Sequence, residues 1–242
     1  FARALRACGQ PPLVLGGMKD TLVLHRRFTG GFTAAMVNRA RIAKPLRLLE
    51  MLQEQGLART PVILSPETPA PELARCGAVP LMSPAHAALL DLSGDPGQRR
   101  AALHQKWRNR LARAEDRGLT VTSGQGAALD WLLRAEEAQR CDRGYRGWPA
   151  TLTRAYLAAN RDAGVLLSAR EAGKPIAAVL ILRHGSAATY HIGHTTPRGR
   201  AVGAHNLLLW RATRQLADSG VSSLELGPLD TESAPGLARF KL

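Results

Sequence analysis

The sequence predicts a mixed α/β protein of the α+β class, with two domains that each contain a mixed, mostly antiparallel sheet flanked by helices. Three observations lead to this prediction. Residues 119–227 indicate the element order β-α-α-β-β-β-α-β, residues 21–65 indicate a partial echo of that order, and short turns such as "AGK" and "GS" join the strands. The echo lies in element order alone, because no residue-level repeat is visible.

The first half supplies the echo. The segments "TLVLHRRF" (21–28) and "GFTAAMVNR" (31–39) predict a hairpin over "TGG". A helix is expected from Pro45 to Gln55, stopped by Gly56, followed by strands at 61–65, 78–82 and 87–93. We assign residues 1–98 to a first, smaller or degenerate domain.

The second half carries the full order. A strand at 119–123 precedes two helices, at 127–140 and 148–163, and a meander of strands at 165–171, 175–184 and 187–194. A helix from about Asn206 to Ser219 ends at Gly220, and the last strand lies at 222–227. Residues 119–242 form the predicted second domain, and residues 99–118 form a basic connecting helix.

The composition is that of a globular protein with an unusual positive charge. The 242 residues are 45% hydrophobic, and 33 Lys and Arg against 19 Asp and Glu give a net charge of +14, which attracts polyanions. Cys8, Cys76 and Cys141 are too few and too scattered for a disulfide framework or a cysteine metal site, and no metal is expected. Apolar runs fall short of the roughly 20 residues of a membrane span. The start at Phe1, without Met or signal peptide, indicates a fragment of a cytoplasmic protein.

The expected helix at 99–118 places five cations within a narrow stripe beside an apolar face. These cations are Arg99, Lys106, Arg110, Arg113 and Arg117. One interpretation is a track for phosphates of tRNA, coenzyme A or an anionic lipid or glycan intermediate. The alternative is a solvated face whose long side chains cover apolar surface. Aromatic residues make up 5% of the chain, which disfavours a module that reads nucleic-acid sequence.

The segment "RAVGAHN" (200–206) places small residues at the start of a helix. The first turn of a helix offers unpaired N–H groups and the positive end of the helix dipole, and Gly203 and Ala204 leave room for a phosphate. An anion site is therefore predicted here. A start chosen for packing or turn geometry is the alternative.

With this element order, the chain resembles the GCN5-related N-acyltransferase (GNAT) superfamily, whose coenzyme A loop follows the fourth strand. In this superfamily the loop has Arg or Gln, two residues, Gly, one residue, and then Gly or Ala. Arg200, Gly203 and His205 occupy these three positions, although His205 replaces the small residue. The segments at 103–121, 203–227 and 236–242 are similar to the Fem-like branch, which carries two GNAT-like domains. The resemblance implies transfer of an acyl group to an amine, from acyl-coenzyme A or, as in the peptidoglycan-bridge enzymes, from aminoacyl-tRNA.

The resemblance also implies a set of site residues. For the acyl donor these are Ile192, Gly193, Arg200, Gly203, Ala204, His205 and Asn206. For an acceptor, a small-molecule or peptide amine, they are Tyr145, Arg146, Trp148, Tyr190, Asp230 and Lys241. Strand alternation places Tyr190, Ile192 and His194 on one face and His191 on the other, which argues against a histidine metal pair.

His194 is the first candidate for a proton acceptor, and Glu225, opposite Leu224 and Leu226, is the second. The alternatives are a structural histidine and a surface carboxylate. The sequence contains no GxSxG, P-loop or HExxH motif, so these hydrolase classes lack their required residues. Three functions remain: an acyl-coenzyme A-dependent N-acyltransferase, which is preferred, an aminoacyl-tRNA-dependent transferase, and a non-catalytic anion-binding protein of the same fold. The oligomeric state is left open.

Overall fold

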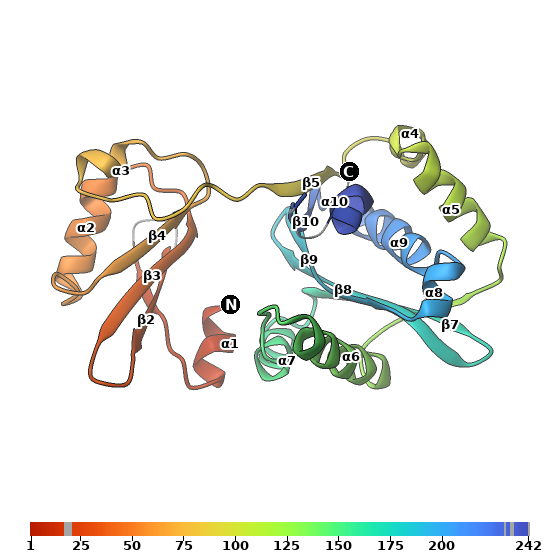
Figure 1. Cartoon of the computed structure of the whole chain (residues 1–242), viewed down its shortest axis with the longest axis horizontal. Helices are drawn as coiled ribbons and strands as arrows, with labels where there is room; N and C mark the ends of the chain where they lie inside the picture. Colours follow the sequence, from red (N-terminus) through yellow and green to blue (C-terminus); the bar gives the residue numbers. More distant parts are fainter. Residues whose placement is uncertain (17–20, 230, 233–234, 242) are drawn as a thin grey trace. The chain divides into compact units, whose positions relative to one another are not determined.

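The computed structural model describes residues 1–16, 21–229, 231–232 and 235–241. The chain forms two compact units, Phe1–Ser83 with Thr151–Ala159, and Pro84–Ala150 with Asn160–Leu242. Each unit contains a mixed sheet with helices against it, which confirms the predicted fold class (Figure 1). The second unit begins at Pro84, because β5 (Ala87–Asp91) joins its sheet, so it includes residues 99–118 as well as residues 84–98.

The first unit is built on a four-stranded sheet in the order β1-β2-β3-β4. Its strands are β1 (Leu13–Leu15), β2 (Thr21–Arg27), β3 (Thr33–Ala40) and β4 (Val62–Pro66), and its helices include α1 (Ala2–Ala7), α2 (Pro45–Glu54) and α3 (Glu72–Arg75). The predicted hairpin is confirmed as β2 and β3. Helix α2 buries Leu48, Met51 and Leu52 against one sheet face, where Val23 and Val37 are completely buried. This amphipathic stripe fixes α2 on the sheet.

The strand predicted at 78–82 is wrong. These residues have no regular structure, and Val79, Leu81 and Met82 are more than three-quarters exposed. Pro80 lacks the N–H that a strand ladder needs, so an apolar run was mistaken for a buried strand.

The second unit is built on a six-stranded sheet in the order β5-β10-β9-β8-β7-β6. The strands are β5 (Ala87–Asp91), β6 (Thr120–Ser123), β7 (Gly164–Glu171), β8 (Lys174–His184), β9 (Ala187–Thr195) and β10 (Ser223–Pro228). Neighbours are antiparallel except β9 and β10, which run parallel. The predicted meander is confirmed as β7, β8 and β9, and Leu180 and Ile181 at its centre are completely buried.

Helices cover both faces of this sheet (Figure 1). They are α4 (Pro96–Ala102), α5 (Gln105–Glu115), α6 (Ala127–Arg143), α8 (Pro197–Ala201), α9 (Ala204–Asp218) and α10 (Pro235–Lys241), while α7 (Ala150–Ala159) groups mainly with the first unit. Helices α9 and α5 share the main core, in which Leu111, Leu208 and Leu216 are completely buried. Helix α6 lies on the opposite face. The order β6-α6-α7-β7-β8-β9-α9-β10 is the predicted one, with the short α8 added.

The predicted continuous helix at 99–118 is also wrong, because the chain turns sharply between α4 and α5. Leu103 and His104 have extended backbones, and the His104 ring accepts a hydrogen bond from the N–H of Lys106 and so caps α5. The Arg108 guanidinium donates to the carbonyls of Ala101 and Leu103 at the end of α4. Arg99 therefore lies on another helix than Lys106, Arg110 and Arg113, and Arg117 follows the end of α5.

Candidate functional site

The central feature of the second unit is the place where its two parallel strands separate. Strands β9 and β10 pair from Ala187 and Ser223 as far as Thr189 and Glu225. Beyond this point β9 pairs with β8, and β10 pairs with β5 after a register shift before Pro228. The separation leaves an opening in the ladder beside residues 190–195. We call it the β9–β10 opening. The backbone of β9 faces this opening without β10 as a partner.

A β-bulge in β9 sits at the same level. Leu180 pairs with Ile192 whereas Ile181 pairs with Tyr190, so His191 is an extra residue in the ladder. The bulge interrupts the alternation of side chains and corrects the prediction that Tyr190, Ile192 and His194 share a face. Tyr190 lies on the α9 side, where it bonds His205, and His194 lies on the α6 side, where it meets Trp131.

On the α9 side, Tyr190 and His205 form a buried pair. The Tyr190 hydroxyl and His205 Nε2 share a hydrogen bond of 3.0 Å. Burial raises the pKa of Tyr190 well above its usual value and lowers the pKa of His205 to about 4, so both groups are neutral near pH 7. A Cβ on Gly193 would lie 1.6 Å from Tyr190 Oη and 2.8 Å from His205 Cε1. Glycine at 193 therefore makes the room that this pair occupies.

On the α6 side, His194 stands at the end of β9 with its ring edge toward Trp131, at 5.4 Å between centroids. Burial lowers the pKa of His194, and the positive charges of Arg200 and Arg143 lower it further. Its Nδ1 atom is buried and has no hydrogen-bond partner among the described residues. His194 is thus a neutral imidazole with a proton-accepting position to spare.

The loop after α6 contributes a second polar group. The Tyr145 hydroxyl donates to Glu136 Oε1 at 2.8 Å and accepts from Gln139 Nε2 at 3.0 Å. The Trp148 ring packs against His191 with centroids 4.6 Å apart, and burial lowers the pKa of His191 to about 4. Contacts with α6 and β9 therefore fix the side chains of Tyr145 and Trp148, whereas the side chain of Arg146 is exposed, and the acceptor-binding role of this loop stays a prediction.

Glu136 and Trp131 are site residues that the sequence reasoning missed. Both lie within the long helix α6, where they read as part of an ordinary amphipathic pattern. Five positions along an α-helix correspond to a rotation of about 140°, so the two side chains do not share a stripe and the sequence offers no signal that groups them. Only the fold shows that α6 covers β9.

Electrostatic interactions connect the two sides of β9. Glu136 and Tyr145 both raise the pKa of Tyr190, and His194 lowers the pKa of His205. Charges from α6 therefore act on groups that bond across to α9. The polar side chains around the β9–β10 opening are a carboxylate, three neutral imidazoles and two phenol groups, those of Glu136, His191, His194, His205, Tyr145 and Tyr190.

The backbone N–H groups just before α9, unlike the polar side chains at the opening, already have hydrogen-bond acceptors within the chain. The N–H groups of Arg200, Val202 and Gly203 donate to carbonyls within and just before α8, and that of Gly199 donates to Thr196 Oγ1. Gly203 has a positive φ of 70°, and a Cβ there would lie 2.9 Å from the Arg110 carbonyl oxygen of α5. Turn geometry and the approach of α5 thus account for Gly203. Ala204 is completely buried and Asn206 nearly so.

The C-terminal helix α10 reaches the same region. The Phe240 ring lies 5.5 Å from the His205 ring and 6.4 Å from the Trp107 ring, measured between centroids. Lys241 Nζ donates to the Pro228 carbonyl oxygen at 2.7 Å. Burial lowers the pKa of Lys241, and the nearby Glu225 carboxylate opposes this effect. Glu225 and Lys241 are thus neighbours beside the opening, while Asp230 lies outside the described residues.

Of the five cations predicted to line one helix, three lie on α5. Lys106, Arg110 and Arg113 are exposed and lie within two helical turns of one another. Arg110 and Arg113 lie near the start of α9, because the Arg110 carbonyl contacts Gly203. Arg117 is exposed beyond the end of α5.

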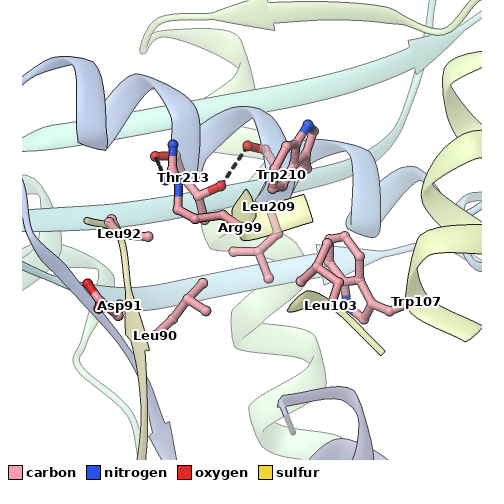
Figure 2. A pocket seen from close by; sticks show the side chains of 9 residues that line it. All are labelled: Leu90, Asp91, Leu92, Arg99, Leu103, Trp107, Leu209, Trp210 and Thr213. Carbon is pink, nitrogen blue, oxygen red and sulfur yellow. Dashed lines mark hydrogen bonds between the residues drawn. The ribbon is translucent and has the colours of Figure 1, made fainter. Parts of the chain in front are cut away.

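A cavity of about 40 Å³ lies between β5, α4, α5 and α9 (Figure 2). Its walls are mainly leucine and tryptophan side chains, and the Arg99 guanidinium crosses it to bond the Thr213 carbonyl oxygen at 3.3 Å. The structure therefore uses Arg99 to join α4 to α9. The cavity has room for a few water molecules and not for an acyl donor. Among the described residues, no helix is long and apolar enough to span a membrane.

Three solved structures have a fold similar to that of the whole chain. FemX aligns over 99% of this chain and 86% of its own, with a TM-score of 0.79 and 11% identity. A conserved protein of unknown function from Bacteroides thetaiotaomicron covers 99% and 83%, with a TM-score of 0.63 and 15% identity. L-PGS from Bacillus licheniformis covers 93% and 70%, with a TM-score of 0.57 and 12% identity. A search of curated protein sequences gives no match.

The two-unit fold, with its separated parallel strands in the second unit, is similar to the fold of FemX. Residues 98–242 match the sequence model of the acetyltransferase (GNAT) domain. This chain belongs to the GNAT acetyltransferase domain family, as its resemblance predicted. The matched residues contain α5, the β9–β10 opening and all of the side chains around it.

Proposed function

We propose that this protein is an N-acyltransferase that joins an acyl group to an amine at the β9–β10 opening. The observation that carries the proposal is the cluster of neutral, proton-carrying side chains around two parallel strands that separate. Membership in the GNAT family supports the reaction class. A carbonyl placed in the opening lies beside the backbone of β9 where the pairing with β10 ends, and backbone N–H groups aimed at a carbonyl oxygen stabilise a developing oxyanion.

The reaction needs two proton transfers. The amine nitrogen bonds the acyl carbon and loses a proton, while the bond from that carbon to the donor oxygen or sulfur breaks and the departing atom takes up a proton. His194, neutral and with Nδ1 unpartnered among the described residues, accepts the amine proton. Tyr190 supplies the proton to the departing atom, and its hydrogen bond to His205 provides the route for its replacement.

The acceptor enters on the α6 side in this proposal. The side chains of Tyr145, Trp148 and Glu136 surround that entrance and are fixed by hydrogen bonds or ring contacts. Aromatic walls with one carboxylate suit a primary amine on a small molecule or a peptide. Arg146 is exposed on the same loop, and in this proposal it contacts the remainder of the acceptor.

For the donor, the geometry favours an aminoacyl-tRNA over acyl-coenzyme A. Four of the backbone N–H groups that a coenzyme A loop would offer, those of residues 199, 200, 202 and 203, already donate within the chain. Helix α5 covers Gly203, where a pyrophosphate would need to approach the backbone. The exposed cations of α5 instead offer a salt-sensitive contact for a nucleic-acid backbone.

Acyl-coenzyme A is the second candidate. It is favoured by one observation, that no side chain caps α9, so that the N–H groups of its first turn, at residues 204–206, have no capping acceptor. In this version Arg200, Gly203, Ala204, His205 and Asn206 hold the donor, and Ile192 and Gly193 align its carbonyl.

Binding measurements with both donors separate the candidates. The probes are total bacterial tRNA charged with amino acids, the same tRNA uncharged, and acetyl-coenzyme A. We expect the charged tRNA to bind more tightly than the uncharged tRNA, and the double variant Arg110→Gln/Arg113→Gln to weaken both while lowering the salt dependence by about two ions. Arg59→Gln, on an exposed arginine of the first unit, is the matched control.

A rise in melting temperature with acetyl-coenzyme A, and none with charged tRNA, would transfer the proposal to the second candidate. Failure of both donors to bind, together with no acyl transfer to a panel of primary amines, would leave the non-catalytic interpretation and overturn the proposal.

A further inference from the structure

The hairpin of the first unit carries a feature that the acyl-transfer site does not use. Strand β1 pairs with β2 as far as Val23, and β4 pairs with β3 from Ala35 onward. Residues 26–34 therefore form the end of a two-stranded ribbon that extends beyond the other strands of its sheet (Figure 1). A ribbon of this kind has few core contacts of its own, so its exposed side chains are not held there by packing.

Two phenylalanines stand at the tip of this ribbon. The N–H of Phe28 donates to the Phe32 carbonyl oxygen at 2.7 Å, and the two rings lie together with centroids 6.0 Å apart. Their side chains are 52% and 56% exposed. Large apolar side chains placed together on a projecting turn are a costly feature in water, and such clusters mark contact surfaces.

The ribbon is also basic. Between residues 21 and 49 the sequence contains six Lys and Arg residues and no Asp or Glu. Arg39 and Arg47 are paired with carboxylates, whereas Arg26 bonds the neutral Gln10 amide, and neither Arg26 nor Arg27 pairs with a carboxylate among the described residues. The Arg27 guanidinium lies beside Gly31 of the turn, next to the rings.

We propose that this ribbon docks the protein on an anionic lipid membrane, with Phe28 and Phe32 inserted among the lipids and Arg26 and Arg27 at the headgroups. The apolar rings at the tip and the cations one and two residues behind them match the depth profile of a membrane interface, which is apolar inside and negatively charged at its surface. The net charge of +14 adds a long-range attraction to the same surface. The proposal is independent of the acyl donor and of the reaction at the β9–β10 opening.

Co-sedimentation with lipid vesicles tests it. The full chain is mixed with vesicles of phosphatidylcholine alone or of phosphatidylcholine with phosphatidylglycerol, at low and at high salt. We expect binding to the anionic vesicles and little to the neutral ones. Phe28→Ser/Phe32→Ser is expected to lower the partition coefficient by about 100-fold, since each ring contributes roughly a factor of ten. Arg26→Gln/Arg27→Gln lowers it by about 25-fold at low salt and less at high salt.

Matched controls come from the same unit. Leu46 on α2 is 67% exposed and Arg59 is exposed, so Leu46→Ser and Arg59→Gln remove an apolar group and a charge away from the ribbon. Both are expected to leave vesicle binding unchanged. The arginine pair tests the ribbon even if the phenylalanine pair fails to fold, because both arginines are exposed.

The proposal would be overturned if the Phe28→Ser/Phe32→Ser variant bound anionic vesicles as tightly as the wild-type protein. It would also be overturned if the control variants lost as much binding as the ribbon variants. Absence of wild-type binding to anionic vesicles would overturn it as well. A wild-type dimer in sedimentation velocity that the phenylalanine substitutions convert to a monomer would assign the ribbon to a contact between two copies of the chain, which also overturns it.

Discussion

The start of α9 and the β9–β10 opening both depend on glycines, but for opposite reasons. At the start of α9, a positive φ and the nearby α5 backbone require glycine at position 203, and the N–H groups before it donate to acceptors within the chain. At the opening, Gly193 makes room for a polar pair, and His194 Nδ1 and His205 Nδ1 are buried without partners among the described residues. The loop before Gly203 uses its backbone N–H groups within the chain, whereas the opening has buried polar atoms that lack a partner among the described residues.

The comparison predicts that a methyl group at Gly203 costs stability. We expect Gly203→Ala to lower the free energy of unfolding by about 3 kcal/mol, because a positive φ and a 2.9 Å approach to the Arg110 carbonyl both oppose a side chain. Gly220 also has a positive φ, of 81°, but open space around it, so Gly220→Ala should cost about 1 kcal/mol. Denaturant unfolding measures both. Equal costs for the two variants would show that α5 does not crowd Gly203.

A methyl group at Gly193 is expected to cost activity as well as stability. In Gly193→Ala the Tyr190 ring must move, which breaks its hydrogen bond to His205, so kcat/KM for acyl transfer should fall about 100-fold. The free energy of unfolding should fall by about 2 kcal/mol, because two buried rings lie in the way and their hydrogen bond is lost. Acyl transfer and denaturant unfolding of the same preparation give both values. An unchanged kcat/KM would show that the hydrogen-bonded pair of Tyr190 and His205 takes no part in proton transfer.

The pH dependence of transfer sharpens the role of His194. Its pKa is lowered from 6.5, and a base must be deprotonated to act, so the rise of kcat/KM with pH should be centred below pH 6.5. Arg200→Gln removes a positive charge and should shift that rise to higher pH. Steady-state kinetics from pH 4 upward check both. If the midpoint of the rise in kcat/KM has the same pH in Arg200→Gln as in the wild-type protein, a group other than His194 is titrating.

A smaller effect is expected in the pH dependence of stability. His191 and His205 have pKa values of about 4 in the folded protein and near 6.5 in the unfolded chain. The unfolded chain binds more protons between these values, so stability should increase as the pH rises from about 4 to 6.5. His191→Gln should flatten this increase in urea unfolding curves. A slope that remains unchanged would show that the His191 imidazole is hydrated in the folded protein.

Much of the fold was predictable, because its signals are local. Strong strand segments, short turns and Gly220 after α9 gave the meander and the final β-α-β order. The errors arose where tertiary contacts decide the structure. The His104 cap and the Arg108 bonds break the expected helix at 99–118, and a single extra residue at His191 reverses which side chains meet on β9.

The site was only partly predictable for the same reason. Trp148 packs against His191 of β9, Tyr190 bonds His205 and His194 meets Trp131, whereas the roles that the resemblance implies for these residues stay predictions. Glu136 looked like a solvated helical residue, and the motif at 200–205 looked like an open anion loop. A sequence shows which N–H groups a loop contains, but not that α8 has already used them.

The most direct test of the account is a comparison of His194→Gln with the wild-type protein in single-turnover acyl transfer and in donor binding. If the reaction takes place at the β9–β10 opening with His194 as the proton acceptor, the rate of transfer falls by about 100-fold or more while the dissociation constant of the donor stays the same. An unchanged transfer rate, with or without a change in binding, would contradict the assignment of the reaction to this opening.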